Sequence, residues 1–345
     1  MGLKFKDIVT KNEISIKELK GKILAVDSMN ILYQFLTSIR GPDGTVLTDS
    51  QGRVTSHLIG LFNRTTSLME EGLKLIFIFD GKAPEIKQKT WEKRTAVKRE
   101  ATLKLKEAEE AGNLEDMRRY SARTAILTKD MVADAKRVIT ALGLPIVQAP
   151  SEGEAQTAYM VKRGDVFASV SQDYDNLIFG CSNLLRNLTI AGKRKKTGKY
   201  GFVTVKPEMI YLQEVLDHLQ LELDQLIVLA IIVGTDYNPG GVKRIGPKTG
   251  LKLLKEFGND FDKLFEKIEW DQHYPELSWK TIFDTIKDIP VTDNYELKWK
   301  SFDEEELFDL LVKGYGFSED RVRSKLNKLK DKKDVLSQKG LSSFF

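Results

Sequence analysis

Apolar segments alternate with helical patterns through the first half of the chain. GKILAVD, LKLIFIFD, LPIVQAP and DVFASVS are continuous apolar runs of strand length, and helical patterns such as SMNILYQFLTSI lie between them. Buried strands that alternate with helices are typical of a parallel sheet covered on both faces. The sequence therefore predicts an α/β fold with a central, mostly parallel twisted sheet and helices on both of its faces.

Acidic residues stand where these apolar runs end. Seven acids share this position: Asp27, Asp80, Glu152, Glu154, Asp173, Asp175 and Asp236. The last of them follows LDQLIVLAIIVGT, a run that is either a buried helix or a buried strand, because periodicity does not decide between the two. Ligands of parallel sheets bind in the crevice beyond the carboxyl ends of the strands. We therefore expect the seven acids to form one carboxylate cluster.

Each acid also has a structural explanation. Asp27 could cap the helix that follows it, and Ser151 with Glu154 matches a capping box. Asp80 and Asp236 could be ordinary turn residues. Seven independent explanations of this kind are needed to account for all the acids, so a shared cluster is the simpler interpretation.

The Asp-Tyr-Asp segment raises the same choice on a smaller scale. Residues i and i+2 of an extended strand point to the same side, so the pleat predicts that Asp173 and Asp175 face one small volume. Like charges held that close are costly unless a cation lies between them. The alternative is a polar turn after the strand, in which Asp bonds nearby backbone N–H groups.

Composition narrows the chemistry of the cluster. The chain has 345 residues, 41% of them hydrophobic and 30% charged, which is typical of a soluble globular protein. One cysteine, Cys181, excludes an internal disulfide, and three scattered histidines with one cysteine make no zinc site. Oxygen ligands without His or Cys select Mg²⁺ or Mn²⁺, and two such ions suit an in-line attack on phosphate.

Basic residues dominate the rest of the chain. The seven acids set aside, 43 acidic residues remain against 54 basic ones, a balance that suits a polyanionic substrate. Residues 85–106 hold eight Lys or Arg at helical spacings, which is also typical of a solvated helix. AGKRKKTGKYG is predicted to be a basic hairpin tip that either contacts DNA phosphates or serves solubility. A Gly-Pro-Lys turn within VKRIGPKTG is similar to hairpin units whose backbone N–H groups face a DNA phosphate.

The motifs VDSMNILYQF, IFIFDGKAPEIK, APSEGEAQ, SQDYD, GTDY and IGPK occur in an order that resembles the flap endonucleases of the archaeal and eukaryotic structure-specific 5′ nuclease family. The resemblance extends from Gly2 to about Gly258. It implies a 5′ flap endonuclease with 5′–3′ exonuclease activity, which hydrolyses phosphodiester bonds at junctions of single and double strand in replication, including Okazaki fragment maturation, and in repair. The seven acids match the ligands of two metal ions, expected to be Mg²⁺ with Mn²⁺ as a substitute.

The resemblance also assigns roles outside the carboxylates. Lys87 and Arg94 match basic residues that contact the scissile phosphate, and Tyr33 matches an aromatic on which a base stacks. Further DNA contacts are expected at Gly2, Lys193, Arg194, Lys195, Lys196, Gly246, Lys248 and Thr249. In the family the hairpin unit binds K⁺, and Arg244 stands here where relatives often carry Gly.

The resemblance predicts a nuclease core over residues 1–330. Its parts would be an N-terminal region, an internal nuclease region and a C-terminal helical region, at 1–130, 131–258 and 259–330. A helical arch is expected at about 85–130, and a helix-hairpin-helix DNA-binding unit at about 226–258. Residues 331–345 are expected to be a flexible tail.

The predicted tail ends in SQKGLSSFF, which is similar to the peptide by which replication proteins bind the sliding clamp, proliferating cell nuclear antigen. Its anchors would be Gln338, Leu341, Phe344 and Phe345. A docking peptide gives two otherwise exposed aromatic rings a binding site. The chain lacks the lysine-rich extension usual in eukaryotic relatives, which favours an archaeal source. We expect a monomer that works with the DNA and away from membranes, in the cytoplasm of an archaeon or the nucleus of a eukaryote.

Two other functions are compatible with parts of the pattern. An aspartyl-nucleophile phosphohydrolase would use the D-x-D pair, but such enzymes usually have Thr or Val two residues after the second Asp, where this chain has Leu177. A non-catalytic, clamp-bound DNA-structure factor leaves all seven acids without a role. Cleavage of a flap with and without Mg²⁺ distinguishes the three hypotheses.

Overall fold

A seven-stranded sheet forms the centre of the molecule. The structure is a computed structural model that describes residues 3–41, 45–121, 124–190, 192–195 and 202–341. The strand order is β1-β9-β6-β5-β2-β3-β4. The bounds are β1 (Asn12–Glu13), β2 (Ile23–Asp27), β3 (Lys74–Phe79), β4 (Ile146–Gln148), β5 (Ala168–Val170), β6 (Asn183–Arg186) and β9 (Glu208–Tyr211). The five strands from β6 to β4 run parallel, and β9 and β1 pair antiparallel at one edge. The predicted, mostly parallel sheet is confirmed.

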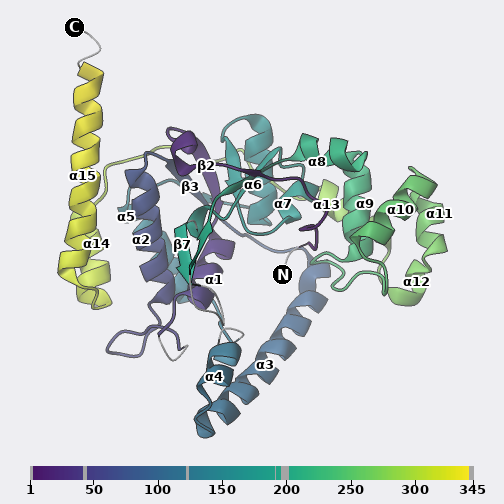
Figure 1. Cartoon of the computed structure of the whole chain (residues 1–345), viewed down its shortest axis with the longest axis horizontal. Coiled ribbons are helices and arrows are strands. Elements are labelled where there is room, and N and C mark those ends of the chain that lie inside the picture. The colour runs from purple at the N-terminus through teal and green to yellow at the C-terminus, as the bar shows by residue number, and fades with distance from the viewer. Residues whose placement is uncertain (1–2, 42–44, 122–123, 191, 196–201, 342–345) are drawn as a thin grey trace.

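Helices cover both faces of the sheet, as predicted (Figure 1). Leu24 and Val26 of β2 face one hydrophobic cluster, whereas Ala25 between them faces another. The first cluster packs against α1 (Ser28–Ser38), α2 (Ser56–Glu70), α5 (Lys129–Ala141) and α15 (Glu319–Leu341), and the second packs against α6 (Gly153–Arg163). Both faces of β2 are therefore buried, which explains why apolar residues do not alternate with polar ones in its sequence.

A third hydrophobic cluster packs several helices together beside β6 and β9. Its helices are α7 (Asp175–Ile178), α8 (Leu212–Leu219), α9 (Leu223–Val233), α10 (Pro247–Phe257), α11 (Phe261–Lys267), α12 (Trp270–His273) and α13 (Trp279–Lys287). The ambiguous run LDQLIVLAIIVGT is the helix α9, and every residue from Leu226 to Val233 is buried. A helix surrounded by packing on all sides has no polar face, so its sequence carries no helical period.

Helices α9 and α10 lie where the helix-hairpin-helix unit is predicted, and they pack on each other. Gly250 in α10 lies so close to α9 that an added Cβ would stand 2.6 Å from Leu229 Cδ1. In the turn between the helices, Arg244 has a φ of 67°, in the left-handed region that glycine favours. The arginine therefore keeps a glycine-like backbone, at a cost of roughly 1 kcal/mol.

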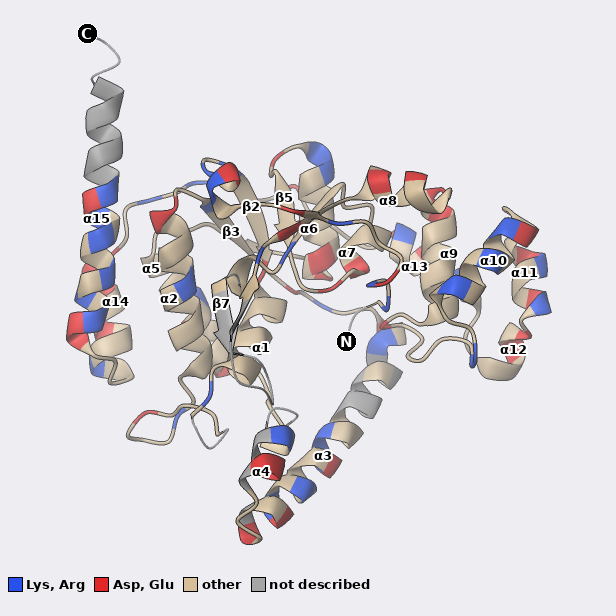
Figure 2. Ribbon diagram, viewed as in Figure 1, with Lys and Arg blue, Asp and Glu red and all other residues tan. Residues whose placement is uncertain are grey.

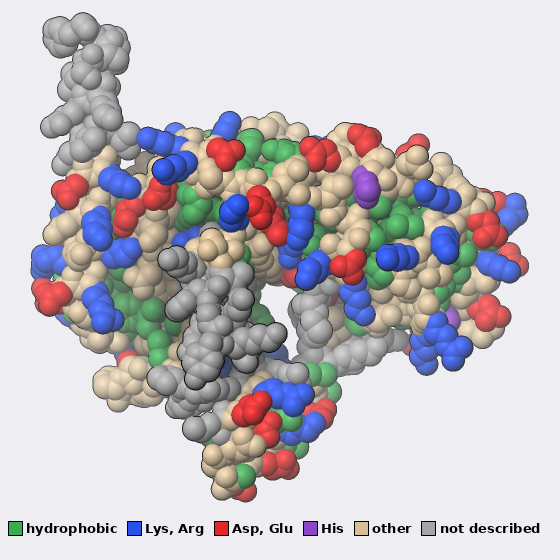
Figure 3. All heavy atoms as spheres, viewed as in Figure 1, with side chains coloured by type: hydrophobic (Ala, Val, Ile, Leu, Met, Phe, Trp, Pro, Cys, Tyr) green, Lys and Arg blue, Asp and Glu red, His purple; other side chains and the backbone are tan. Residues whose placement is uncertain are grey.

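Two helices project from the body (Figure 1). They are α3 (Gln88–Glu110) and α4 (Leu114–Ser121), preceded by the short helix η2 (Glu85–Lys87), and they pack on each other. Space-filling atoms show an opening between this pair and the body (Figure 3). The predicted arch region is therefore a projecting helical pair, and the chain rejoins the body at α5.

The predicted basic hairpin exists, but its basic residues are not all at the tip. Strands β7 (Gly192–Lys195) and β8 (Phe202–Val205) pair antiparallel, so Lys193, Arg194 and Lys195 belong to a strand. Lys196 lies outside the described residues.

The C-terminal region contains helices, and the last of them runs past residue 331, where the tail is predicted to begin. It contains α14 (Glu304–Leu307), the π-helix η4 (Phe308–Gly314) and α15. Helix α15 continues past residue 331 to Leu341. Gln338 and Leu341 are therefore helical positions, whereas Phe344 and Phe345 lie outside the described residues. The remaining short helices are η1 (Ile16–Leu19) and η3 (Leu188–Ile190). Within the described ranges, no helix combines the length and the apolar character that a membrane span requires.

Candidate metal centre

The parallel strands β2 and β3 end side by side, and each is followed or closed by an acid. Asp27 is the last residue of β2 and also the N-cap of α1, where its Oδ1 accepts from the Asn30 backbone N–H at 3.1 Å. Asp80 directly follows β3, which pairs with β2 through Asp27 and Ile78. Asp27 thus caps a helix and also lies at the carboxyl end of a parallel strand, so the two interpretations of this residue are compatible.

The start of α6 joins this edge through Asp80. The Gly153 N–H donates to Asp80 Oδ1 at 2.7 Å. A Cβ on Gly153 would stand 2.6 Å from the same oxygen, so only glycine allows this approach. Glu152 is the N-cap of α6 but makes no side-chain cap bond. The predicted capping box of Ser151 and Glu154 was therefore wrong. The carboxylates of Glu152 and Glu154 do not cap the helix and are available to the metal centre.

Asp173 and Asp175 are not positioned by the pleat of a strand, as was predicted. Strand β5 already ends at Val170, Asp173 lies in the bend that follows, and Asp175 is the first residue of α7. The pleat therefore does not align them. Instead, the Asn30 side-chain amide donates to Asp173 Oδ2 at 3.0 Å, and the Leu3 N–H donates to Asp175 Oδ1 at 3.0 Å.

Lys87 lies among the acids. Its Nζ stands 2.7 Å from Glu152 Oε1 and 3.6 Å from Asp236 Oδ2. It also lies 5.2 Å from the ring centroid of Tyr237, whose hydroxyl donates to Glu152 Oε1 at 3.0 Å. The Thr90 hydroxyl donates to the Asp236 carbonyl, so the first turns of the projecting pair are bonded to the centre. Acidic positions gather around α6 and α7, with basic positions at the start of α3 (Figure 2).

Two buried carboxyl groups of the centre, those of Asp27 and Asp175, resist ionisation. Burial first, and then the neighbouring charges of Asp80 and Asp173, raise the pKa of Asp27 to about 8. Burial and the charges of Asp236 and Asp173 raise the pKa of Asp175 to about 7.

The pKa values of two further carboxyl groups of the centre are also raised. Burial raises the pKa of Asp80 above its usual value, and burial together with Asp175 and Asp27 raises that of Glu154 well above it. For Lys87 burial acts in the opposite direction, yet the surrounding carboxylates raise its pKa. The centre therefore holds more negative charge than one ammonium offsets.

The donor set fits hard divalent cations. All seven predicted ligands offer carboxylate oxygen, and the raised pKa values indicate a site that gains from added positive charge. Within the described residues, however, no group of three or more His, Cys, Asp or Glu side chains is already placed to hold a metal ion. Lys87 provides the positive charge between Glu152 and Asp236.

The other predicted residues lie around this centre or outside the described atoms. Tyr33 is exposed on α1, and Lys98 Nζ of the projecting pair lies 5.5 Å from its ring centroid. Gly246 is the N-cap of α10, and Lys248 and Thr249 are exposed in its first turn. Arg94 belongs to α3, but its side chain lies outside the described atoms, as do those of residues 193–195. Gly2 also lies outside the described residues.

Four polar residues of the centre were missed in the sequence. Asn30 bonds Asp173, Ser171 donates to Asp27 Oδ2 at 3.2 Å and Glu154 Oε1 at 3.3 Å, Tyr237 bonds Glu152, and Thr90 bonds Asp236. Each stands within four residues of a predicted site residue along the chain. Their position close to a predicted site residue along the chain is the signal by which the sequence could have identified them.

Comparison with known protein families finds two matching models. Residues 2–101 match the XPG N-terminal domain, and residues 143–236 match the XPG I-region. Together these segments carry all seven acids of the centre.

Individual proteins match over nearly the whole chain. Flap endonuclease 1 of Pyrococcus horikoshii is 47% identical over 345 residues, covering 100% of this chain and 98% of that protein. Flap endonuclease 1 of Hyperthermus butylicus is 48% identical over 333 residues, covering 96% of this chain and 94% of that protein. Both relatives are archaeal.

Solved structures give the same result. Flap endonuclease-1 from Methanococcus jannaschii superposes with a TM-score of 0.73 at 42% identity, covering 96% of this chain and 98% of that one. The catalytic core of Rad2 in complex with a DNA substrate gives a TM-score of 0.68 at 24% identity, covering 95% and 100%. At that lower identity the similarity concerns the fold alone.

Proposed function

This chain belongs to the flap endonuclease family, and from that premise we propose how its residues cleave DNA. It is a structure-specific 5′ flap endonuclease of DNA replication and repair, and therefore a phosphodiester hydrolase. Nucleases of this family use divalent metal ions. The single observation that carries the proposal is the convergence of buried carboxylates and one lysine where β2 and β3 end.

The ions of this enzyme would be two Mg²⁺, replaceable by Mn²⁺, held by Asp27, Asp80, Glu152, Glu154, Asp173, Asp175 and Asp236. When bound, they supply a hydroxide from water and offset the charge that develops on the phosphate. The oxygen-only donor set and the raised carboxyl pKa values support this assignment. Asn30, Ser171 and Tyr237 hold individual carboxylates in place through hydrogen bonds.

Lys87 would bind the scissile phosphate with Arg94. Its ammonium is already inside the carboxylate centre, so a phosphate that enters the centre meets a cation held by Glu152. A fixed cation acts on the charge that develops in the transition state. Tyr33 would support a base beside the centre, since its ring is exposed on the helix that Asp27 caps.

The parts around the centre would hold the branched DNA. A 5′ single strand would pass under the projecting pair α3 and α4, where Figure 3 shows an opening. The first turn of α10, with Gly246, Lys248 and Thr249, would bind a phosphate of the duplex, because the N–H groups of a helix start attract anions. K⁺ binding in the preceding turn is supported by the left-handed backbone that Arg244 retains. Gly2 and residues 193–196 would add DNA contacts.

The C-terminal residues Gln338, Leu341, Phe344 and Phe345 would bind the sliding clamp. Helix α15 extends through Gln338 and Leu341, which are three residues apart along it. Deletion of residues 337–345 should leave cleavage without the clamp unchanged and abolish stimulation by it. Full stimulation of the truncated enzyme would disprove this role. The enzyme would work as a monomer wherever the DNA is, which in an archaeon is the cytoplasm.

Product mapping tests the proposed function directly. A 5′-labelled double-flap substrate with Mg²⁺ should give one main product, cut at the junction, and no product when EDTA removes the metal. Release of inorganic phosphate alone would indicate a phosphohydrolase. Metal-independent binding without cleavage would indicate a DNA-structure factor.

A further inference from the structure

Three fully buried polar side chains lie beside Glu154 of the carboxylate centre. They are Thr157 of α6, Ser169 of β5 and Asn176 of α7, and each of them is 0% exposed. We name these three side chains the Asn176 network. Helix α6 packs on both α7 and β5, so the network lies where two helices and a strand meet (Figure 1). The function proposed above assigns no role to any of the three.

Hydrogen bonds join the three side chains to one another. The Ser169 hydroxyl lies 2.7 Å from Asn176 Oδ1 and 2.9 Å from Thr157 Oγ1, and Thr157 Oγ1 lies 2.9 Å from Asn176 Oδ1. Thr157 Oγ1 also lies 2.8 Å from the Glu154 carbonyl oxygen, three residues back along α6. One proton from each hydroxyl is enough to serve both acceptors, the amide oxygen and the carbonyl oxygen.

The amide of Asn176 points its nitrogen at a carboxylate of the centre. Its Nδ2 lies 3.4 Å from Glu154 Oε1. An ionised carboxylate only accepts hydrogen bonds and would repel an amide oxygen, so the hydroxyls and the carboxylate together fix one orientation of the amide. Ser171 Oγ approaches the same Oε1 at 3.3 Å. Two donors therefore converge on one oxygen of Glu154.

The network holds Glu154 at two places. Thr157 bonds its backbone carbonyl, and Asn176 faces its side chain. Both side-chain donors reach Oε1, so within the described residues Oε2 is the oxygen of this carboxylate that hydrogen bonds leave to an ion. Asn30 holds Asp173 in the same way, with its amide nitrogen 3.0 Å from Oδ2. The centre thus twice sets an asparagine amide against a carboxylate.

A structural role alone does not account for the Asn176 network. Three apolar side chains would join α6, β5 and α7 equally well, because buried polar partners that are replaced together by apolar groups of the same shape cost little stability. Hydrogen-bonded polar groups in a core instead restrict the positions of the groups that they bond. A network that ends on an acid of the centre is therefore better explained by the position of that acid.

We propose that Asn176 is a positioning residue of the metal centre, which holds the Glu154 carboxylate in the orientation that binds a divalent cation. Ser169 and Thr157 orient the amide, and the amide orients the carboxylate. Groups that hydrogen-bond a metal ligand in this way fix its orientation, and their loss typically lowers metal affinity about tenfold to a hundredfold. The inference rests on the proposed function, because it requires a metal ion at the carboxylates.

Metal binding without DNA tests the proposal independently of cleavage. The probe is Mn²⁺ added to the full chain, and the free ion is measured by its electron paramagnetic resonance signal. Asn176→Leu keeps a similar volume and removes the amide, so we expect the affinity for one Mn²⁺ ion to fall about tenfold. Ser169→Ala leaves the amide in place and removes a donor to its oxygen, and it should lower the same affinity about twofold to fivefold.

Cleavage should show the loss only when metal is scarce. A weakened site fills at high metal concentration by mass action, so Asn176→Leu should cleave about tenfold slower than wild type at limiting Mg²⁺ and within about twofold of it at saturating Mg²⁺. Thr66→Val is the matched control, because Thr66 is 0% exposed and its hydroxyl bonds the Phe62 carbonyl of its own helix at 2.8 Å. This control should lower the thermal unfolding midpoint without changing the Mn²⁺ affinity.

Unchanged Mn²⁺ affinity in both Asn176→Leu and Ser169→Ala would overturn the proposal. If Asn176→Leu does not fold, Ser169→Ala decides the question alone. A loss of cleavage that saturating Mg²⁺ does not restore would also overturn it, since the network would then only stabilise the fold. Asp173→Ala separates these results from a failure of the proposed function. If this variant binds Mn²⁺ as tightly as wild type, the metal centre itself is wrongly assigned.

Discussion

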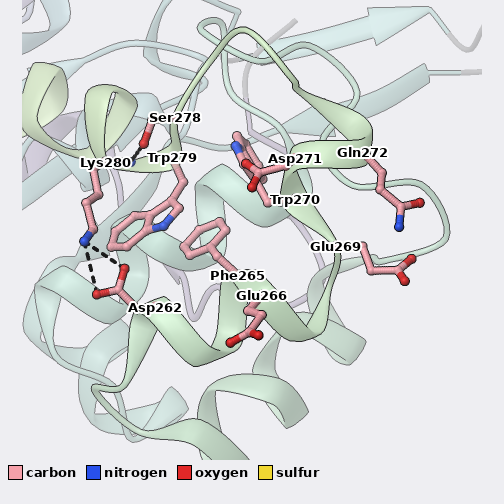
Figure 4. A pocket seen from close by; sticks show the side chains of 10 residues that line it. All are labelled: Asp262, Phe265, Glu266, Glu269, Trp270, Asp271, Gln272, Ser278, Trp279 and Lys280. Carbon is pink, nitrogen blue, oxygen red and sulfur yellow. Dashed lines mark hydrogen bonds and ion pairs between the residues drawn. The ribbon is translucent and has the colours of Figure 1, made fainter.

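The carboxylate centre can be compared with the α11–α13 pocket, a cavity of about 530 Å³ between α11, α12 and α13 (Figure 4). Both sites contain several acids beside apolar residues, but the acids of the two sites differ in exposure. In the centre, Asp27, Glu152 and Asp175 are between 4% and 8% exposed, and protein donors fix their oxygens. In the pocket, Glu266 and Glu269 are exposed and only the rings behind them are fixed. Burial makes the carboxyl groups of Asp27 and Asp175 costly to charge, whereas water already solvates those of Glu266 and Glu269.

The difference indicates what each site can bind. Buried carboxylates with more negative charge than their neighbours offset gain most from small, doubly charged ions, so the centre suits divalent cations. Exposed carboxylates gain little from each ion pair, because water already solvates them. Substitutions should therefore affect cleavage severely in the centre and very little in the pocket.

The largest effect is expected from removal of one centre acid. Asp173→Ala or Asp80→Ala should lower cleavage about a thousandfold, near the upper end of what the loss of one charge-stabilising group costs. Flap binding should stay largely intact, because we propose that the duplex is held at the start of α10. Single-turnover cleavage and a gel-shift titration measure the two quantities. A near wild-type rate in saturating Mg²⁺ would rule out the metal assignment.

Lys87→Ala should lower the single-turnover rate about a hundredfold and change affinity only a few-fold, since a cation placed on developing charge acts in the transition state. Arg94→Ala should behave in the same way if it shares this role. Equal losses in rate and affinity would make these residues ordinary backbone contacts.

Gly153→Ala tests the geometry of the centre without removing an acid. The new Cβ would stand 2.6 Å from Asp80 Oδ1, so the carboxylate has to move. We expect about a tenfold to hundredfold slower cleavage, as for other displacements of about 1 Å. The thermal unfolding midpoint serves as the control. A slower rate that only follows global unfolding would remove the special role of this contact.

Tyr237→Phe should slow cleavage by about fivefold, because Glu152 loses one buried hydrogen bond worth about 1 kcal/mol. Tyr274→Phe is the matched control. Its hydroxyl bonds the Asn238 and Gly241 carbonyls in the same region but no acid of the centre. If both variants cleave equally slowly, Tyr237 merely stabilises the fold.

The smallest effect on cleavage is expected in the pocket. Glu266→Gln with Glu269→Gln should leave the cleavage rate and the Mg²⁺ dependence within about twofold of wild type, because exposed charges far from the substrate contribute little. The comparison fails if this double variant loses cleavage to the extent that Asp173→Ala does.

The sequence predicted the parts of the fold that follow from local pattern. Asp27 and Asp80 were placed correctly because adjacent parallel strands end at one edge, which apolar runs reveal. The arrangement of Asp173 and Asp175 was wrong because β5 stops three residues earlier, and the bend after Val170 depends on bonds to Asn30 and Leu3, far away in the sequence.

Other features depend on tertiary packing in a similar way. The nature of α9 was open in the sequence because its burial on all sides erases the helical period. Lys87 was predicted to face a phosphate, but its bond to Glu152 could not be predicted, because it requires α6 and the projecting pair to meet. The α11–α13 pocket left no signal, since its rings come from three helices with ordinary amphipathic spacing.

The bond from Leu3 to Asp175 has a consequence for the order of synthesis. The two residues stand 172 positions apart, and β1 pairs with β9 across a similar span. A ribosome must therefore deliver more than half of the polypeptide before its first residues find their native partners. Contacts of such sequence separation form slowly because a long loop has to close. The N-terminal segment therefore cannot adopt its native contacts until more than half of the chain has been synthesised. The enzyme becomes able to cut DNA only after these late contacts have formed.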